Sequence, residues 1–141
     1  MIVIDCSALV QMYVDEGPAG TAVRGRIAKE STLIAPFLID IEVASALFGM
    51  ARGIRGTKPK LSQRALDAAL QAYAALPLRR MEHVPLLPRV RELCTNLSAY
   101  DASYVALAEL YDVPLITSDV RIGRANVGRC PIETYASPST A

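Results

Sequence analysis

Short apolar runs alternate along this chain with longer segments in which apolar residues recur at helical spacing. The short runs end at polar or turn residues and are typical of buried strands, and the longer segments are typical of helices that cover a sheet. We expect strands at 2–4, 32–35, 79–82, 113–117 and 131–134. We expect helices that start at 5–7 and end near 13, and then at about 18–29, 37–52, 62–75, 86–95 and 100–110, with a brief helix or turn from 118.

Strands that are regularly separated by helices predict an α/β fold, with a mainly parallel sheet covered by helices on both faces. The 141 residues suffice for one domain, and the chain contains neither an internal repeat nor a linker between domains. We therefore expect a single domain over residues 1–136, followed by a frayed tail over residues 137–141.

Apolar residues make up 52% of the chain, but no run of them reaches the roughly 18 residues that a membrane span requires. The mean hydropathy is +0.27 and the sequence opens without a secretory leader, so we expect a soluble, cytoplasmic protein with no membrane partner. The three cysteines are odd in number and lack the spacing of a metal site, and we expect free thiols without a disulfide.

Fifteen basic and fourteen acidic residues give a net charge of +1, which neither favours nor excludes a polyanionic partner. The distribution is more informative, because two segments without any acidic residue concentrate positive charge. Each segment is compatible with a solvated surface or with contact to a polyanion. The first segment, 43–66, holds Arg52, Arg55, Lys58, Lys60 and Arg64, and the second, 120–132, holds Arg121, Arg124 and Arg129.

Four acidic residues lie far apart in the chain but at equivalent places in the expected fold. Asp5 and Asp119 follow the ends of the first and fourth expected strands, where open parallel sheets bind their ligands. Glu42 and Asp101 lie near the starts of two expected helices. Covering helices run antiparallel to the strands, so those helix starts lie at the same edge of the sheet. We therefore expect all four carboxylates to meet at that edge.

Each of these acids also has a simpler explanation, because an acidic residue near a helix start caps free backbone amides. Glu42 fits this explanation less well, since its helical neighbours are mostly apolar and its carboxylate must be neutralised, hydrogen-bonded or bound to a cation. Two carboxylates about 4 Å apart repel by roughly 4 kcal/mol, and no Lys or Arg is spaced to serve each acid. A hard divalent cation such as Mg²⁺, which prefers oxygen ligands, would stabilise such a cluster.

Three hydroxyl residues lie within two positions of the first and last of these acids, and they are Ser7, Thr117 and Ser118. They are candidates for a supporting role in the site and equally for helix capping.

His83 carries the only imidazole in the chain, and we expect it to have a surface or structural role. Tyr104 is expected to pack in the core.

Three parts of the chain resemble the motifs of PIN domains, specifically of the compact VapC-type toxin ribonucleases of toxin–antitoxin pairs. Residues 2–9, Ile-Val-Ile-Asp-Cys-Ser-Ala-Leu, resemble the first motif. Residues 42–47, Glu-Val-Ala-Ser-Ala-Leu, resemble the second, and residues 97–104 with 114–119 resemble the third and fourth together. The order and separation of these motifs extend the resemblance over nearly the whole chain.

Two residues depart from the family pattern. Cys6 stands where Thr or Ser is common, and Ser45 replaces a frequent Asn, which would alter neighbouring hydrogen bonds but removes no candidate metal ligand. The resemblance implies a three-layer α/β/α sandwich, dependence on Mg²⁺ or Mn²⁺, and RNA as the substrate. It also implies a homodimer and inhibition by a cognate antitoxin protein.

The resemblance and the four acids together suggest a mechanism. Asp5, Asp101 and Asp119 would position one or two divalent ions, and Glu42 would complete the site directly or through water. A metal-bound water would hydrolyse an RNA phosphodiester, while the basic segments hold the RNA backbone. Two alternatives stay open, namely a catalytically silent PIN-like module that binds RNA or protein, and an aspartyl-phosphate or phosphoryl-transfer domain. The latter fits poorly, because Asp5 lacks a second Asp two positions later.

Overall fold

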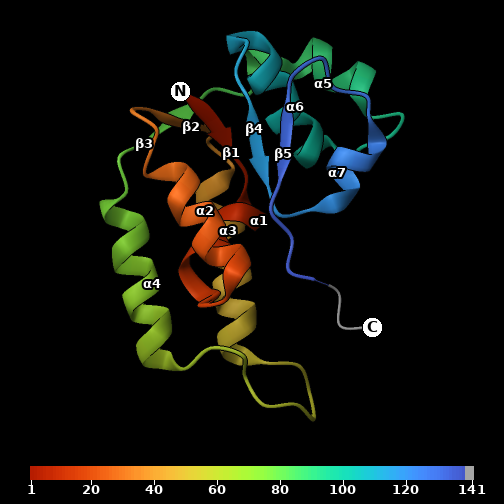
Figure 1. The fold of residues 1–141 in the computed structure, drawn as a ribbon. Coiled ribbons are helices and arrows are strands. Elements are labelled where there is room, and N and C mark those ends of the chain that lie inside the picture. The colour runs from red at the N-terminus through yellow and green to blue at the C-terminus, as the bar shows by residue number, and fades with distance from the viewer. Residues whose placement is uncertain (139–141) are drawn as a thin grey trace.

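The computed structural model describes residues 1–138 and contains a five-stranded sheet in which each pair of neighbouring strands is parallel (Figure 1). The order across the sheet is β3-β2-β1-β4-β5. The strand order therefore reverses between β1 and β4, which is where open α/β sheets form a ligand-binding crevice. The strands are β1 (Ile2–Ile4), β2 (Leu33–Pro36), β3 (Leu78–Met81), β4 (Leu115–Thr117) and β5 (Ile132–Thr134).

Helices follow each of the first four strands and form two layers. Parallel connections are right-handed, so the helices before β3 and those after it cover opposite faces of the sheet (Figure 1). On one face α1 packs against α2 and α3, and on the other α6 lies across β1, β2 and β4. This confirms the expected α/β/α sandwich. The helices are α1 (Cys6–Val14), α2 (Pro18–Ile27), α3 (Ile39–Arg52), α4 (Gln63–Ala75), the 3-10 turn η1 (Val84–Leu86), α5 (Leu87–Leu93), α6 (Ala99–Tyr111) and α7 (Val120–Ala125).

The central strands form the most deeply buried part of the core. All three residues of β1 are fully buried, as are Leu115 and Ile116 of β4. A strand with helices on both faces has no polar face, which is why these strands appear in the sequence as continuous apolar runs. Their rigid carboxyl ends hold the residues that follow them in fixed positions.

The expected elements are present, and most boundaries agree within two or three residues. Ser62 caps α4 by accepting a hydrogen bond from the Ala65 amide at 3.1 Å. The expected helix 86–95 is present as the shorter α5, and η1 directly precedes it. Pro85 and Pro88 stand in the first turns of η1 and α5, where proline, which lacks an amide hydrogen, is tolerated.

The end of the chain lies close to α1 as far as the structure describes it. Ser137 accepts a hydrogen bond from the Gln11 side chain at 3.0 Å. A frayed tail was expected over 137–141, and residues 139–141 of it lie outside the described residues.

Cys6, Cys94 and Cys130 are free, as expected. Across residues 1–138, no helix combines the length and apolar character that crossing a bilayer would need.

Candidate active site

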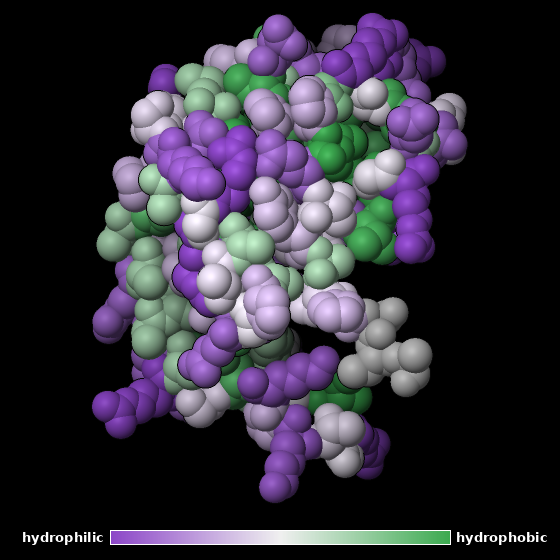
Figure 2. All heavy atoms as spheres, viewed as in Figure 1, coloured by the Kyte–Doolittle hydropathy of each residue, from purple (hydrophilic) through white to green (hydrophobic). Residues whose placement is uncertain are grey.

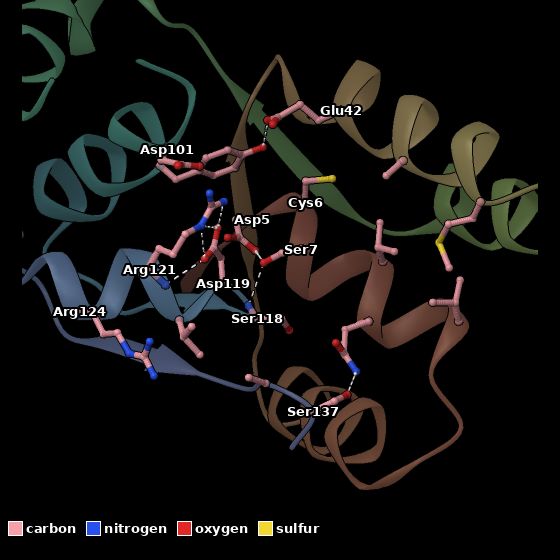
Figure 3. A pocket seen from close by; sticks show the side chains of 18 residues that line it. Asp5, Cys6, Ser7, Glu42, Asp101, Ser118, Asp119, Arg121, Arg124 and Ser137 are labelled. Carbon is pink, nitrogen blue, oxygen red and sulfur yellow. Dashed lines mark hydrogen bonds and ion pairs between the residues drawn. The ribbon is translucent and has the colours of Figure 1, made fainter. Parts of the chain in front are cut away.

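An open pocket of about 1110 Å³ lies at the carboxyl edge of the sheet, where the strand order reverses (Figure 3). Its lining includes all four acids that the sequence singled out, Asp5, Glu42, Asp101 and Asp119. They come from the end of β1, the first turn of α3, the first turn of α6 and the residue before α7. The expectation that the topology gathers these four side chains is confirmed.

Asp5 is the most deeply buried of the four, with 4% of its surface exposed. One carboxylate oxygen accepts hydrogen bonds from the Ser7 hydroxyl at 2.7 Å and the Ala8 amide at 2.9 Å, and the other accepts from Thr117 at 2.5 Å. Burial raises the pKa of Asp5 to about 6 although these hydrogen bonds lower it. Asp5 therefore caps α1 and also lines the pocket, so its capping role does not exclude a role in the site.

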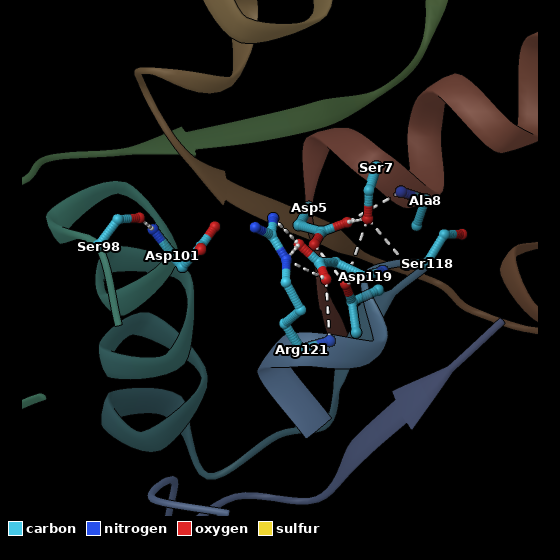
Figure 4. A network of polar contacts seen from close by, with 9 residues as sticks. Asp5, Ser7, Ala8, Ser98, Asp101, Ser118, Asp119 and Arg121 are labelled. Carbon is cyan, nitrogen blue, oxygen red and sulfur yellow. Dashed lines mark hydrogen bonds and ion pairs between the residues drawn. The ribbon is translucent and has the colours of Figure 1, made fainter. Parts of the chain in front are cut away.

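A hydroxyl network joins Asp5 to the turn after β4 (Figure 4). The Ser7 oxygen accepts a hydrogen bond from the Ser118 amide at 2.8 Å, and the Thr117 hydroxyl accepts one from the Asp119 amide at 3.0 Å. The network fixes the first and last acidic segments relative to each other. Ser118 contributes its amide rather than its hydroxyl, which is buried without a partner among the described residues.

Glu42 is held by a tyrosine that sequence reasoning assigned only to the core. Tyr104 is 1% exposed, as expected for core packing, but its hydroxyl donates a hydrogen bond of 2.7 Å to the Glu42 carboxylate. Burial raises the pKa of Glu42, and this hydrogen bond opposes the rise. Tyr104 lies one helical turn after Asp101 on α6, so the same helix carries one acid and orients another.

Asp101 does not cap its helix, and that explanation for it is wrong. Ser98 is the cap, because its hydroxyl accepts a hydrogen bond of 3.1 Å from the Asp101 amide. The Asp101 carboxyl is thus left facing the pocket. Burial raises its pKa, as does the charge of Asp119, and Asp101 in turn raises the pKa of Asp5 and Glu42. The four carboxylates form one electrostatic cluster.

Asp119 has a basic partner that the sequence did not reveal. It caps α7 by accepting a hydrogen bond from the Arg121 amide at 2.9 Å, and both of its oxygens also accept from the Arg121 guanidinium. This ion pair lowers the pKa of Asp119. No ion pair joins a Lys or Arg of residues 1–138 to Asp5, Glu42 or Asp101.

The donor chemistry of the cluster fits a hard divalent cation, because the pocket offers several carboxylate oxygens and hydroxyls. In this structure the four carboxylates are not arranged as the ligands of a single ion. Within residues 1–138, no three Asp, Glu, His or Cys side chains converge as ligands of one ion would. The reason is visible in the contacts, since Asp119 is turned onto Arg121 and Glu42 onto Tyr104. Asp119 would have to exchange its guanidinium partner for the ion.

The two basic segments differ in their relation to the pocket, because only the second contributes basic side chains to its lining. Arg121 and Arg124 of the second segment line it, together with Met50 near the end of α3. The loop 53–62, which belongs to the first segment, follows directly after α3 and extends away from the body of the fold (Figure 1). Figure 2 shows hydrophilic side chains at this lower end of the molecule, mixed with hydrophobic ones.

His83 has the structural role that was expected. Its Nε2 accepts a hydrogen bond of 3.2 Å from the Leu38 amide, next to the start of α3. Cys6 lines the pocket, and burial raises the pKa of its thiol to about 12, so the thiol is neutral in the metal-free protein.

Comparison with known proteins identifies the family of the chain. The family model described as "PIN domain" matches residues 2–127. Ribonuclease VapC9 of Mycobacterium tuberculosis is 39% identical over 132 residues, which cover 94% of this chain and 96% of that protein.

Solved structures share the fold. VapC20 of M. tuberculosis, described as a sarcin-ricin loop cleaving toxin, superposes with a TM-score of 0.65 at 15% identity and covers 89% of this chain and 95% of its own. VapBC2 of Rickettsia felis, solved bound to a DNA fragment from its promoter, gives a TM-score of 0.63 at 14% identity, with 96% and 99% covered. The chain therefore belongs to the PIN-domain family, and within it to the group of the VapC ribonucleases.

Proposed function

We propose that this protein is a divalent-metal-dependent endoribonuclease that acts as the toxin of a toxin–antitoxin pair. The observation that carries the proposal is the cluster of four carboxylates, drawn from four separate elements, that line one pocket at the reversal of strand order. Similarity to VapC ribonucleases over 94% of the chain supports RNA as the substrate. The chemistry of carboxylate and hydroxyl donors supports Mg²⁺ or Mn²⁺.

In this proposal Asp5, Asp101 and Asp119 would hold the ion, and the hydroxyls around Asp5 would keep its carboxylate aimed at the pocket. When bound, the ion would supply a water of lowered pKa and would neutralise charge that develops on the phosphodiester. Glu42 is fixed by Tyr104 at the opposite wall and would orient a water molecule by hydrogen bonding. None of these roles needs a His, Ser or Cys nucleophile.

The RNA backbone would be held by basic side chains at the pocket and in the adjoining loop. Arg124 lines the pocket without a hydrogen bond or ion pair among residues 1–138, so its guanidinium is available to a phosphate. Binding through phosphates is sensitive to salt and selects little for base. We therefore expect the affinity for RNA to fall steeply with ionic strength.

The apolar half of the same pocket supports an antitoxin partner. Val10 and Val14 of α1 and Ala46 and Met50 of α3 line it beyond the acids. A peptide segment that buries apolar side chains there would cover the carboxylates and exclude RNA.

Homodimerisation is a further part of the proposal, supported by large apolar side chains that the single chain leaves exposed, such as Ile41, which is 75% exposed. Size-exclusion chromatography with light scattering tests it.

The aspartyl-phosphate alternative is disfavoured by the sequence around Asp5. Ser7 stands two positions after Asp5, where that alternative needs a second Asp, and the Ser7 hydroxyl instead donates a hydrogen bond of 2.7 Å to the Asp5 carboxylate. The silent-module alternative predicts RNA or protein binding without cleavage, which an activity assay separates from the proposal.

The test is cleavage of single-stranded RNA by the purified protein with Mn²⁺ or Mg²⁺, with EDTA, and in the variant Asp101→Asn. The matched control is Asp67→Asn, which removes the same charge from an exposed position on α4 outside the pocket. Cleavage should disappear in EDTA and in Asp101→Asn and persist in Asp67→Asn, with unfolding midpoints close to that of the unaltered protein. Full activity in EDTA, or in Asp101→Asn, would refute the proposed mechanism.

A further inference from the structure

Arg121 is the one basic side chain among residues 1–138 that forms an ion pair with the acidic cluster. Its Nε lies 3.0 and 3.1 Å from the two carboxylate oxygens of Asp119, and its Nη2 lies 2.5 Å from the second of them. The guanidinium thus engages both oxygens of one carboxylate, a geometry that makes a charge-assisted pair strong and directional. Both oxygens of Asp119 thus accept hydrogen bonds from a cation that a metal ion would have to replace.

The guanidinium also lies near a second member of the cluster. Figures 3 and 4 show it rising from α7 between Asp119 and Asp101. The two charges influence each other, because Arg121 opposes the rise that burial causes in the pKa of Asp101, and Asp101 adds to the rise that Asp119 causes in the pKa of Arg121. A positive charge therefore lies between two of the proposed metal ligands, where the carboxylates would otherwise repel each other.

The Arg121 guanidinium is bound by Asp119 and is otherwise largely exposed to solvent. The Arg121 side chain is 82% exposed, whereas that of Asp119 is 19% exposed. Among the described residues, every hydrogen bond of the guanidinium goes to Asp119. Rotation of one exposed side chain would therefore free the carboxylate without disturbing the core, and the α7 cap would survive because it uses the Arg121 backbone amide.

We propose that Arg121 is an internal counter-ion of the metal site, displaced from Asp119 when a divalent ion binds and then available to a phosphate of the RNA. The inference rests on the proposed function and adds to it an ordered exchange of partners. Without metal the guanidinium neutralises the acids, and with metal the same guanidinium points its planar fork at the anionic substrate. Arg121 thereby couples metal binding to RNA binding.

The first test is the affinity for Mn²⁺ in the absence of RNA, measured by isothermal titration calorimetry. Arg121→Gln removes the competitor, so Mn²⁺ should bind about 3- to 5-fold more tightly, the range that an exposed ion pair can supply. Arg124→Gln is the matched control, because it removes the same charge from the same helix and pocket but from a side chain without contact to the acids. Its Mn²⁺ affinity should change less than about 2-fold.

Equal Mn²⁺ affinities for the two variants would overturn the inference while leaving the proposed metal site intact. Absence of Mn²⁺ binding by the unaltered protein, or binding unchanged in Asp101→Asn, would instead overturn the proposed function and the inference with it. The unfolding midpoint of each variant shows whether it is folded.

The second test is the affinity for RNA with Ca²⁺ and with EDTA. Ca²⁺ uses the same oxygen ligands as Mg²⁺ but in a looser geometry, so it can fill the site. Arg121→Gln should weaken RNA binding about 5-fold in Ca²⁺ and less than about 2-fold in EDTA, because only the metal-bound form releases the guanidinium. Arg124→Gln should weaken it to the same extent in both. An equal loss for Arg121→Gln in both conditions would show a permanent phosphate contact and would overturn the exchange.

Discussion

Replacing Asp5 with Asn is expected to stabilise the metal-free protein at neutral pH. Burial raises the pKa of Asp5 to about 6, well above its ordinary value of 3.8, so the folded state binds the proton more tightly than the unfolded chain. The ionised carboxylate therefore costs stability in the folded protein. This loss of stability is absent below the pKa that Asp5 has in the unfolded chain, and it reaches its full size above the pKa that Asp5 has in the folded protein.

The size of the effect follows from the difference in pKa. A difference of about two pKa units lowers the free energy of unfolding by about 3 kcal/mol at a pH of about 7.5. At a pH of about 4.5 the loss is only about 1 kcal/mol, because Asp5 is already protonated in most of the folded molecules. An Asn side chain can keep the interactions with Ser7 and Ala8 through its oxygen. Its amide can donate to Thr117, whose oxygen already accepts one hydrogen bond and can accept another.

The assay is urea unfolding of both proteins at the two pH values, in EDTA so that no ion stabilises the carboxylate. The free energy of unfolding of Asp5→Asn should exceed that of the unaltered protein by about 2–3 kcal/mol near neutral pH, and the gain should shrink in acid. Asp67→Asn, an exposed acid on α4, serves as the control and should show no such gain. A loss of stability in Asp5→Asn at neutral pH would refute the reasoning about burial.

Three other predictions follow from particular contacts. Tyr104→Phe removes the hydrogen bond to Glu42 and should slow RNA cleavage about 10-fold in a single-turnover assay, with unchanged cleavage contradicting a positioning role. Gly20→Ala would place a Cβ 2.0 Å from the Asp15 carbonyl oxygen, so the α1–α2 corner must open, and urea unfolding should show a loss of about 2–3 kcal/mol. Ser62→Ala removes the α4 cap and should cost about 1 kcal/mol of stability while leaving cleavage unaffected.

The sequence predicted the fold and the gathering of the acids for one physical reason. Apolar runs separated by helices permit few arrangements other than a parallel sheet, and such a sheet brings strand ends and helix starts to one edge. Asp5 and Glu42, 37 residues apart in the chain, could therefore be placed in the same pocket from the sequence alone.

The contacts within the site were less predictable, because they depend on side-chain rotamers. Helical spacing predicts that Tyr104 is buried but does not say which group its hydroxyl reaches. Arg121 is long and exposed, and its sequence position allows it to point to solvent as readily as to Asp119. The capping role of Ser98 could have been found, since a Ser followed three residues later by an acid resembles a capping box.

The most direct test of the central claim is a crystal structure of the protein soaked in Mn²⁺, analysed by anomalous scattering. The account predicts an anomalous peak in the pocket, about 2.0–2.3 Å from carboxylate oxygens of at least two of Asp5, Asp101 and Asp119, with the Arg121 guanidinium withdrawn from Asp119. A pocket without such a peak at saturating Mn²⁺, or a peak bound only elsewhere on the molecule, would contradict it.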